Sequence, residues 1–139
     1  MLGAQDLFDG PLRLASVRRY LEDRRNIVLV ACEGPRVIGF LRGTALDQLE
    51  SGRRQFFLYE LAVADDRRRQ GVGRALMERL LVLSRRLGHE EVFVFTDDPK
   101  NRAAHRLYRS TGGRTETRGE RMYVYRWNGR RPGGRPARR

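Results

Sequence analysis

A turn rich in arginine and glycine carries the clearest chemical signal in this sequence. Residues 67–74 read RRRQGVGR and lie between an apolar segment and a helical pattern. Free N–H groups at the start of a helix bind phosphate, because the helix dipole adds positive potential there and glycine lets an anion approach the backbone. The spacing matches neither the dinucleotide-binding G-x-G-x-x-G pattern nor a Walker loop. By spacing alone, a phosphate site and an ordinary basic turn before a helix both remain open.

One carboxylate interrupts the apolar segment that precedes this turn. Glu60 is the only charged residue in the run QFFLYELAV, residues 55–63, and alternation places it on the strand face of Phe56 and Leu58. A carboxylate in such a position is rarely left unpaired. Glu60 therefore either forms a salt bridge with an arginine or binds the ammonium of a substrate and accepts its proton.

Three further side chains also allow two interpretations each. Tyr108 lies on a helix face with Ala104, which suits either a core tyrosine or a proton donor. Asp98 fits the N-cap of that helix, because Pro99 follows it in the first turn. Asp97 and Asp98 also end a strand, where a carboxylate is well placed to recognise a cationic substrate.

Length and composition exclude several classes of protein. The 139 residues suit one domain, and 40% hydrophobic with 33% charged residues is typical of a globular chain. No apolar run approaches the roughly 18 residues of a membrane span, and the first ten residues do not resemble a secretory signal. A lone Cys32 and only two histidines argue against a disulfide framework and a metal centre. We therefore expect a cytoplasmic protein that uses no metal.

The net charge of +12 comes almost wholly from arginine, since Lys100 is the only lysine. Such an excess attracts phosphates, so nucleic acid and a polyphosphate cofactor are both candidate partners. No recognised nucleic-acid motif is present, and the aromatic residues fall in apparent core strands. A nucleic-acid-binding module is therefore the least favoured of the candidate functions. Five arginines lie in the last ten residues, within a tail over residues 128–139 that we expect to be disordered.

Periodicity predicts a mixed α/β chain with a single domain over residues 1–127. Helices are predicted over residues 12–23, 71–88 and 98–110. Strands are predicted over residues 27–32, 37–46, 55–63, 91–96 and 121–127. The first strand and Cys32 are expected to be buried, and the unit over residues 55–96 is expected to be a right-handed crossover between parallel strands. The expected architecture is a mostly antiparallel central sheet with flanking helices.

Two motifs on these elements resemble those of a known family. The pattern R-x-x-G-x-G over residues 68–73, after a hydrophobic strand, is similar to the acyl-CoA pyrophosphate signature of the GNAT superfamily of N-acetyltransferases. A second element of that family, N-x-x-A-x-x-x-Y-x-x-x-G over residues 101–112, follows at the expected distance. Within the superfamily, the segment YELAV over residues 59–63 and the Asp97-Asp98-Pro99 segment look like the type I aminoglycoside 3-N-acetyltransferases. The resemblance covers roughly residues 4–127.

The resemblance implies the GNAT fold, acetyl-CoA as donor and direct transfer to an amine in a ternary complex. It implies that Tyr108 stabilises or protonates the CoA thiolate, and we favour the interpretation in which Glu60 binds the acceptor ammonium or accepts its proton. It also implies a bulge and splayed strands at Ala62 and Val63, where the Val63 N–H would polarise the thioester carbonyl. The donor-binding residues implied by the motifs are Leu61, Ala62, Val63, Arg68, Arg69, Gln70, Gly71, Val72, Gly73, Arg74, Asn101, Ala104 and Tyr108.

Three functions remain open at this point. The first is acetylation of an aminoglycoside, at its 3-amino group, with Glu60, Asp97 and Asp98 as carboxylates for a polycation. The second is acetylation of a small amine or of a protein amine, such as the N-terminus of a ribosomal protein. The third is a basic module that binds RNA or DNA, whose binding would weaken steeply with salt. Because such acetyltransferases are often dimeric, a homodimer through the last strand is also expected.

Overall fold

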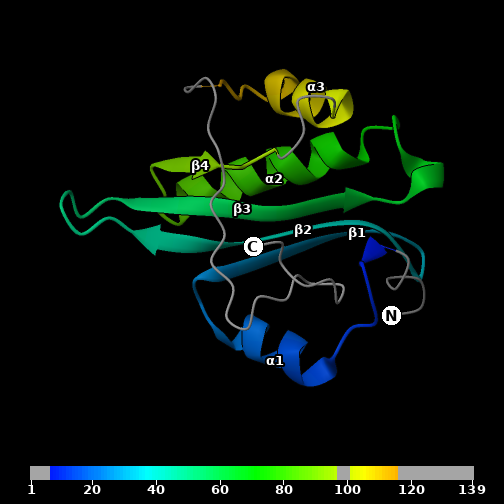
Figure 1. The fold of residues 1–139 in the computed structure, drawn as a ribbon, viewed down its shortest axis with the longest axis horizontal. Coiled ribbons are helices and arrows are strands. Elements are labelled where there is room, and N and C mark those ends of the chain that lie inside the picture. Colours follow the sequence, from blue (N-terminus) through cyan, green and yellow to red (C-terminus); the bar gives the residue numbers. More distant parts are fainter. Residues whose placement is uncertain (1–6, 97–100, 116–139) are drawn as a thin grey trace, which may run out of the picture.

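The computed structural model of the chain describes residues 7–96 and 101–115. A four-stranded sheet in the order β1-β2-β3-β4 has α1 on one face and α2 and α3 on the other (Figure 1). The elements are α1 (Leu14–Glu22), β1 (Asn26–Glu33), β2 (Arg36–Asp47), β3 (Arg54–Val63), the 3-10 turn η2 (Asp65–Arg67), α2 (Val72–Arg86), β4 (Glu91–Phe93) and α3 (Arg102–Ser110). Strands β1, β2 and β3 are antiparallel, and β4 is parallel to β3. The predicted fold class is therefore confirmed, and so is the parallel pairing of the two strands that α2 connects.

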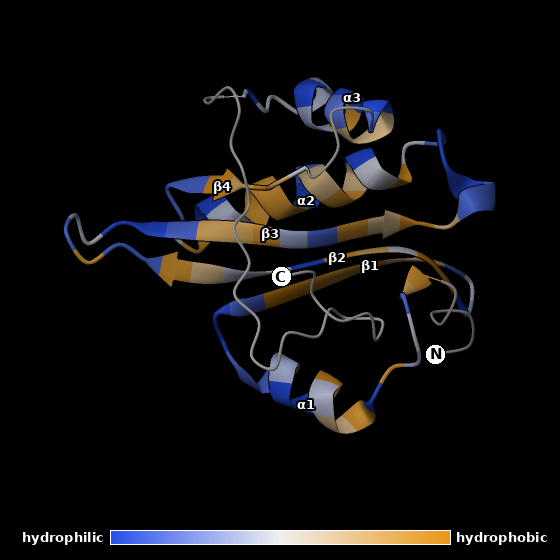
Figure 2. Cartoon of the chain, viewed as in Figure 1, coloured by the Kyte–Doolittle hydropathy of each residue, from blue (hydrophilic) through white to orange (hydrophobic). Residues whose placement is uncertain are grey.

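The core lies between the sheet and α2. Leu41, Phe56 and Leu58 project from β2 and β3 and are fully buried against Leu76 and Leu80 of α2. Figure 2 shows apolar residues gathered on the strands and α2, and hydrophilic residues along the turn between β3 and α2. Burying one such side chain contributes about 1.5–3 kcal/mol, so this layer supplies much of the stability. No helix within the described ranges is long and apolar enough to cross a membrane.

Strand β1 is an edge strand, and the expectation that it is fully buried is wrong. Only Ile27 of this strand is buried, Val30 is half exposed and Cys32 is exposed. Every second side chain of β1 faces the side of α1, a helix that has no buried residue of its own. An unbroken apolar run therefore does not identify a strand covered on both faces.

Two predicted boundaries differ from the structure. Strand β4 ends at Phe93, three residues earlier than predicted, and α3 begins at Arg102 rather than near Asp98. Asn101 caps α3 by accepting a hydrogen bond from the Ala104 N–H at 3.2 Å, so the assignment of Asp98 as the cap is wrong. Asparagine and aspartate are equally good caps, which is why local sequence did not separate them. Asp97, Asp98, the predicted strand 121–127 and the tail lie outside the described residues.

Strand β3 contains one more residue than its partner β2 at a single point. The register passes from Leu58 opposite Gly43 to Glu60 opposite Arg42, so Tyr59 is the extra residue of a β-bulge. Such a bulge interrupts the regular alternation of side chains between the two faces of a sheet. The faces of all later β3 residues are therefore shifted by one position.

Beyond the bulge, Glu60 faces α1 rather than the core. Leu61 lies opposite the buried Leu41 and packs against the same cluster as Leu58, which leaves Glu60 on the other face. The expectation that Glu60 shares a face with Phe56 and Leu58 is therefore wrong. Simple alternation along residues 55–63 assumes that each residue has a partner on the neighbouring strand. The extra residue in β3 depends on the register with β2, so alternation along one strand does not predict it.

The bulge requires a glycine opposite it. A Cβ at Gly43 would overlap the carbonyl oxygen of Phe57 and lie 2.6 Å from the Phe56 ring. We therefore expect Gly43→Ala to lower the free energy of unfolding by about 1–3 kcal/mol, the usual cost of overpacking. Urea unfolding at equilibrium measures this change. Gly10→Ala is the control, because nothing lies within 4 Å of a Cβ there; equal effects of the two substitutions would contradict the steric explanation.

His89 makes the stability of the fold depend on pH. Its ring stacks on Phe56 at 5.4 Å between centroids, and its buried Nδ1 has no hydrogen-bond partner among the described residues. Burial, and then the charge of Arg54, lower the pKa of His89 below its ordinary value of 6.5. The unfolded chain therefore binds a proton more readily, so this contribution is complete above about pH 6.5 and is lost as the pH falls.

We expect the urea concentration at the unfolding midpoint to decrease as the pH is lowered from 7.5 to 5.5. This decrease should be smaller in His89→Phe. The phenylalanine keeps a ring against Phe56 but has no group that titrates. Unfolding curves at several pH values in this window measure the effect. The same slope in both proteins would assign the pH dependence to other groups.

Candidate active site where β3 and β4 diverge

Strands β3 and β4 pair only at one end. The parallel ladder joins residues 55–57 of β3 to Glu91–Phe93, and β3 continues to Val63 without a β4 partner in the described part of the chain. The expected divergence of two strands is therefore present. The expected bulge is also present, but it lies at Tyr59 rather than at Ala62 and Val63.

The backbone of Val63 faces this opening. Val63 lies opposite Gly39, and the next N–H, that of Ala64, donates to the Ile38 carbonyl at 2.9 Å. In an antiparallel ladder this pattern makes Val63 and Gly39 a non-hydrogen-bonded pair. The Val63 N–H therefore points away from β2, toward the side on which β4 diverges. It is an oriented donor that the sheet does not use.

The turn before α2 gathers a second set of free N–H groups. Arg69 and Gly71 both have left-handed backbones, with φ of 61° and 86°, and α2 starts directly after Gly71 without a side-chain cap. The first intrahelical bond here runs from the Ala75 N–H to the Gly71 carbonyl at 3.0 Å. The N–H groups of residues 72–74 therefore have no partner within the helix. Such a concave run of N–H groups at a helix start binds anions.

Arg67 and Arg68, at the start of this turn, already have carboxylate partners. Arg67 pairs with Glu33 at 2.7 Å and so ties the turn between β1 and β2 to the turn before α2. Arg68 pairs with Asp65 at 3.0 Å, and its Nε donates to the Val63 carbonyl at 3.4 Å. Both side chains of the Arg68–Asp65 pair are largely exposed, and exposed pairs contribute only about 0–1 kcal/mol. An incoming anion can therefore replace Asp65 at Arg68.

The remaining polar residues of the turn differ in whether their side chains have hydrogen-bond or ion-pair partners. The Gln70 side chain donates to the Asp66 carbonyl at 3.3 Å, and Arg74 pairs with Glu78 one helical turn later at 2.8 Å. Arg69 has no ion pair or hydrogen bond from its side chain within the described ranges. Arg69 and Arg68 are thus the cations of this turn that are most available to an anion.

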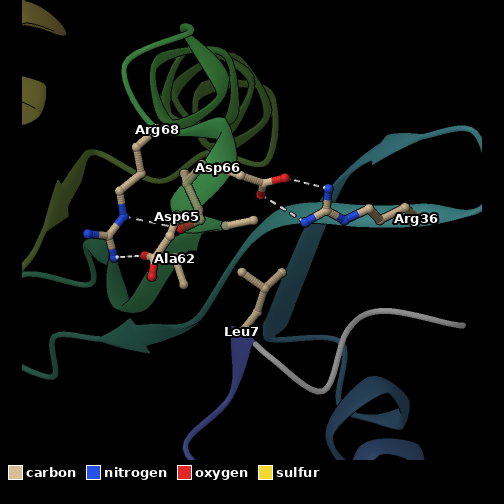
Figure 3. A pocket seen from close by; sticks show the side chains of 8 residues that line it. Leu7, Arg36, Ala62, Asp65, Asp66 and Arg68 are labelled. Carbon is tan, nitrogen blue, oxygen red and sulfur yellow. Dashed lines mark hydrogen bonds and ion pairs between the residues drawn. The ribbon is translucent and has the colours of Figure 1, made fainter.

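A hollow of about 320 Å³ lies at the end of β3 on the face of α1 (Figure 3). Arg36 spans it with two 2.8 Å hydrogen bonds to Asp66, and these bonds lower the pKa of that carboxyl group. The hollow is lined by Leu7, Arg36, Ala62, Val63, Ala64, Asp65, Asp66 and Arg68. Glu60 lies two residues before Ala62 on the same strand face but is not one of the lining residues.

Glu60 is paired, as one of its two interpretations predicted. Its Oε2 accepts a hydrogen bond from Arg42 Nε at 2.7 Å. The Arg42 guanidinium lies over the rings of Tyr59 and Tyr20, at 4.5 Å and 5.6 Å from their centroids. The Tyr20 hydroxyl donates to the Gly43 carbonyl at 2.8 Å and so joins α1 to β2 beside the bulge.

Tyr108 lies on α3 and packs against the core cluster on the α2 side of the sheet. Both ends of its short helix are fixed, by the Asn101 cap on the Ala104 N–H and by a 2.8 Å bond from the Gly113 N–H to the Tyr108 carbonyl. Burial raises the pKa of Tyr108 above 10.0. Its hydroxyl has no hydrogen-bond partner among residues 7–96 and 101–115, so it is a protonated donor without an internal acceptor.

The two titratable candidates lie on opposite faces of the sheet. Glu60 faces α1, whereas Tyr108 packs on the side of α2. Arg42 was missed at the sequence level, although it is the only charged residue in the predicted strand 37–46. A single charged residue within an apolar strand is the same signal that singled out Glu60.

Comparisons with known proteins agree with this geometry. The model of the acetyltransferase (GNAT) family matches residues 5–112. An aminoglycoside acetyltransferase from an uncultured soil metagenomic sample, solved with trehalose, has a TM-score of 0.76 and 28% identity, covering 86% of this chain and 78% of that one. A second aminoglycoside acetyltransferase from an uncultured soil metagenomic sample has 32% identity and a TM-score of 0.71, covering 84% of this chain and 77% of that one.

A curated relative from rat is similar over a shorter stretch. N-acetyltransferase 8B of Rattus norvegicus is 34% identical over 79 residues, which are 57% of this chain and 36% of that protein. The chain thus spans little more than a third of the length of this curated relative.

The pairing of Arg68 with Asp65 should compete with anion binding. Asp65→Asn removes the carboxylate, so we expect inorganic pyrophosphate to bind roughly two- to fivefold more tightly, the range of one exposed ion pair. Titration calorimetry at low salt measures the dissociation constant. Asp47→Asn is the control, because it makes the same charge change at an exposed pair with Arg54 at the other end of β3. Equal tightening in both variants would show a general charge effect.

Proposed function

Because the chain belongs to the acetyltransferase (GNAT) family, we propose that it transfers an acetyl group from acetyl-CoA to the 3-amino group of an aminoglycoside. The family match spans residues 5–112, and enzymes of this family generally use acetyl-CoA as donor. The choice of an aminoglycoside as acceptor rests on the similarity to aminoglycoside acetyltransferases, one of them 32% identical and another solved with sisomicin. The segment YELAV over residues 59–63 supports the 3-amino position.

The turn before α2 suits the pyrophosphate of the donor. The free N–H groups of residues 72–74 provide aligned donors, and Arg68 and Arg69 add positive charge. The thioester would then extend along the open side of β3 toward Val63. There the oriented Val63 N–H would donate to the thioester oxygen as negative charge develops on it.

Glu60 would accept the proton that the acceptor ammonium loses. An ammonium must lose a proton before its nitrogen can attack the thioester carbon, and a carboxylate on the α1 face can take that proton directly or through water. The C–N bond then forms, the negative charge passes through the carbonyl oxygen, and the C–S bond breaks. Asp97 and Asp98 remain proposed contacts of the acceptor.

Tyr108 would stabilise the departing thiolate. Burial raises the pKa of this phenol, whereas the thiol formed from CoA has a pKa of about 8.5. Complete proton transfer from the phenol to the thiolate is therefore unfavourable, and a hydrogen bond to the sulfur is the favoured contribution. The raised pKa keeps the phenol protonated, and thus able to donate, throughout the neutral range.

A second candidate function is acetylation of a less highly charged amine, such as a protein N-terminus. The observation that favours it is the 34% identity over 79 residues to N-acetyltransferase 8B of Rattus norvegicus, a relative whose name does not include an aminoglycoside. An acceptor panel separates the two functions. Turnover with monoamine peptides but not with aminoglycosides would select this second function.

The decisive assay is release of CoA thiol from acetyl-CoA with sisomicin as acceptor. We expect Tyr108→Phe to lower kcat roughly 10- to 100-fold, the effect of one hydrogen bond to a charged group, with little change in acetyl-CoA binding. We expect Glu60→Gln to lower kcat/KM for sisomicin. Glu50→Gln, in the exposed turn between β2 and β3, is the control and should match the wild type.

Other outcomes would contradict separate parts of the proposal. Full activity of Tyr108→Phe would remove the proposed hydrogen bond to sulfur but leave the reaction in place. Binding of acetyl-CoA without acetylation of any aminoglycoside would remove the proposed acceptor. Absence of acetyl-CoA binding would remove the proposed donor.

A further inference from the structure

We propose that Arg42 is a positioning residue, which holds the Glu60 carboxylate in place for the acceptor amine. The inference rests on the proposed function, because it assigns Arg42 a role in the same transfer reaction. Arg42 acts through Glu60 and does not itself contact the reacting atoms. Its evidence is the geometry of one ion pair, the two rings that enclose it and the bulge beside it.

The Arg42–Glu60 pair leaves one carboxylate oxygen available. Arg42 Nε bonds to Oε2 of Glu60 at 2.7 Å, while Oε1 has no hydrogen-bond partner among the described residues. The Glu60 side chain is 27% exposed, so a molecule from solvent can reach it. One oxygen is thus anchored, and the other is free to accept a hydrogen bond from an ammonium and then its proton.

The anchor itself is held firmly. The Arg42 guanidinium lies 4.5 Å from the centroid of the Tyr59 ring and 5.6 Å from that of Tyr20. A planar guanidinium stacks on aromatic faces in a way that an ammonium does not. Among the described residues, this is the only ion pair in which neither side chain is more than a third exposed. The side chain of Arg42 is 33% exposed and that of Glu60 is 27% exposed.

The bulge explains why these groups meet at the opening. Tyr59 is the extra residue of β3, so its ring and the carboxylate of Glu60 come from consecutive residues and both contact Arg42. Glu60 precedes Val63 by three residues, about 10 Å along a strand. Without Arg42, the carboxylate would sample other rotamers in solvent and would meet an amine less often in the reactive orientation.

The test measures sisomicin acetylation by Arg42→Met and Arg42→Lys. Methionine keeps an apolar side chain between the rings but cannot hold the carboxylate. We expect kcat/KM for sisomicin to fall about 10- to 100-fold in Arg42→Met, the range for one charge-assisted hydrogen bond. Arg42→Lys should recover part of the loss, because it restores the charge without the planar stacking. The dissociation constant for CoA should change less than twofold in both variants.

A double-mutant cycle separates positioning from a general structural effect. In a Glu60→Gln background, Arg42→Met should lower kcat/KM by less than about threefold, since no carboxylate remains to be positioned. Arg54→Met is the control, because its pair with Asp47 is exposed and lies at the other end of β3. Its activity and melting temperature should match those of the wild type.

Three results would overturn the assignment. A full additional loss from Arg42→Met in the Glu60→Gln background would show that Arg42 acts independently of Glu60. A weakened affinity for CoA that accounts for the whole loss would make Arg42 a structural residue only. Absence of thiol release by the wild-type protein would overturn the proposed function and this assignment together, whereas the first two results would leave the proposed function intact.

Discussion

One extra residue in β3 decides which groups meet at the candidate site. Tyr59 is inserted directly after Leu58, which lies opposite Gly43, and a side chain at Gly43 would collide with the neighbouring strand. Up to Leu58 the strand builds the core with α2; beyond it, Leu61 returns to the core while Glu60 faces α1. A carboxylate inside the core would be strongly destabilising without a partner. The bulge instead places it beside Arg42 at the edge of the opening.

The divergence of β3 and β4 is the second constraint, because it connects two faces that a continuous sheet would separate. Tyr108 lies on the side of α2, and Glu60 lies on the side of α1. Between them, the Val63 N–H points away from β2 into the open side. In a proposed transfer reaction, one face would supply the group that stabilises the thiolate and the other the group that takes the proton. The strand between them would stabilise the oxyanion.

Around the turn before α2, several arginines are paired with carboxylates. Although the chain carries a net charge of +12, Arg36, Arg67 and Arg68 all bond to carboxylates around the turn before α2. Pairing of this kind fixes the loops and lowers the local potential, so that the backbone N–H groups at the start of α2 remain the specific anion donors. Near α2, the arginines that an anion can engage are therefore Arg68, whose pair with Asp65 is exposed, and Arg69, which has no side-chain partner among the described residues.

The fold class, the core helix α2 and the arginine-glycine turn could all be predicted from the sequence, because each depends on local periodicity or on the backbone properties of consecutive residues. It also singled out Glu60 and Tyr108 as candidates. The face of Glu60, the identity of Arg42 as its partner and the exposure of Cys32 became visible only in the folded chain. Those features follow from the register between strands and from which element covers each face. Both depend on residues far apart in the chain, so a local pattern can single out Glu60 and Arg42 as isolated charges but cannot pair them or assign them to a face.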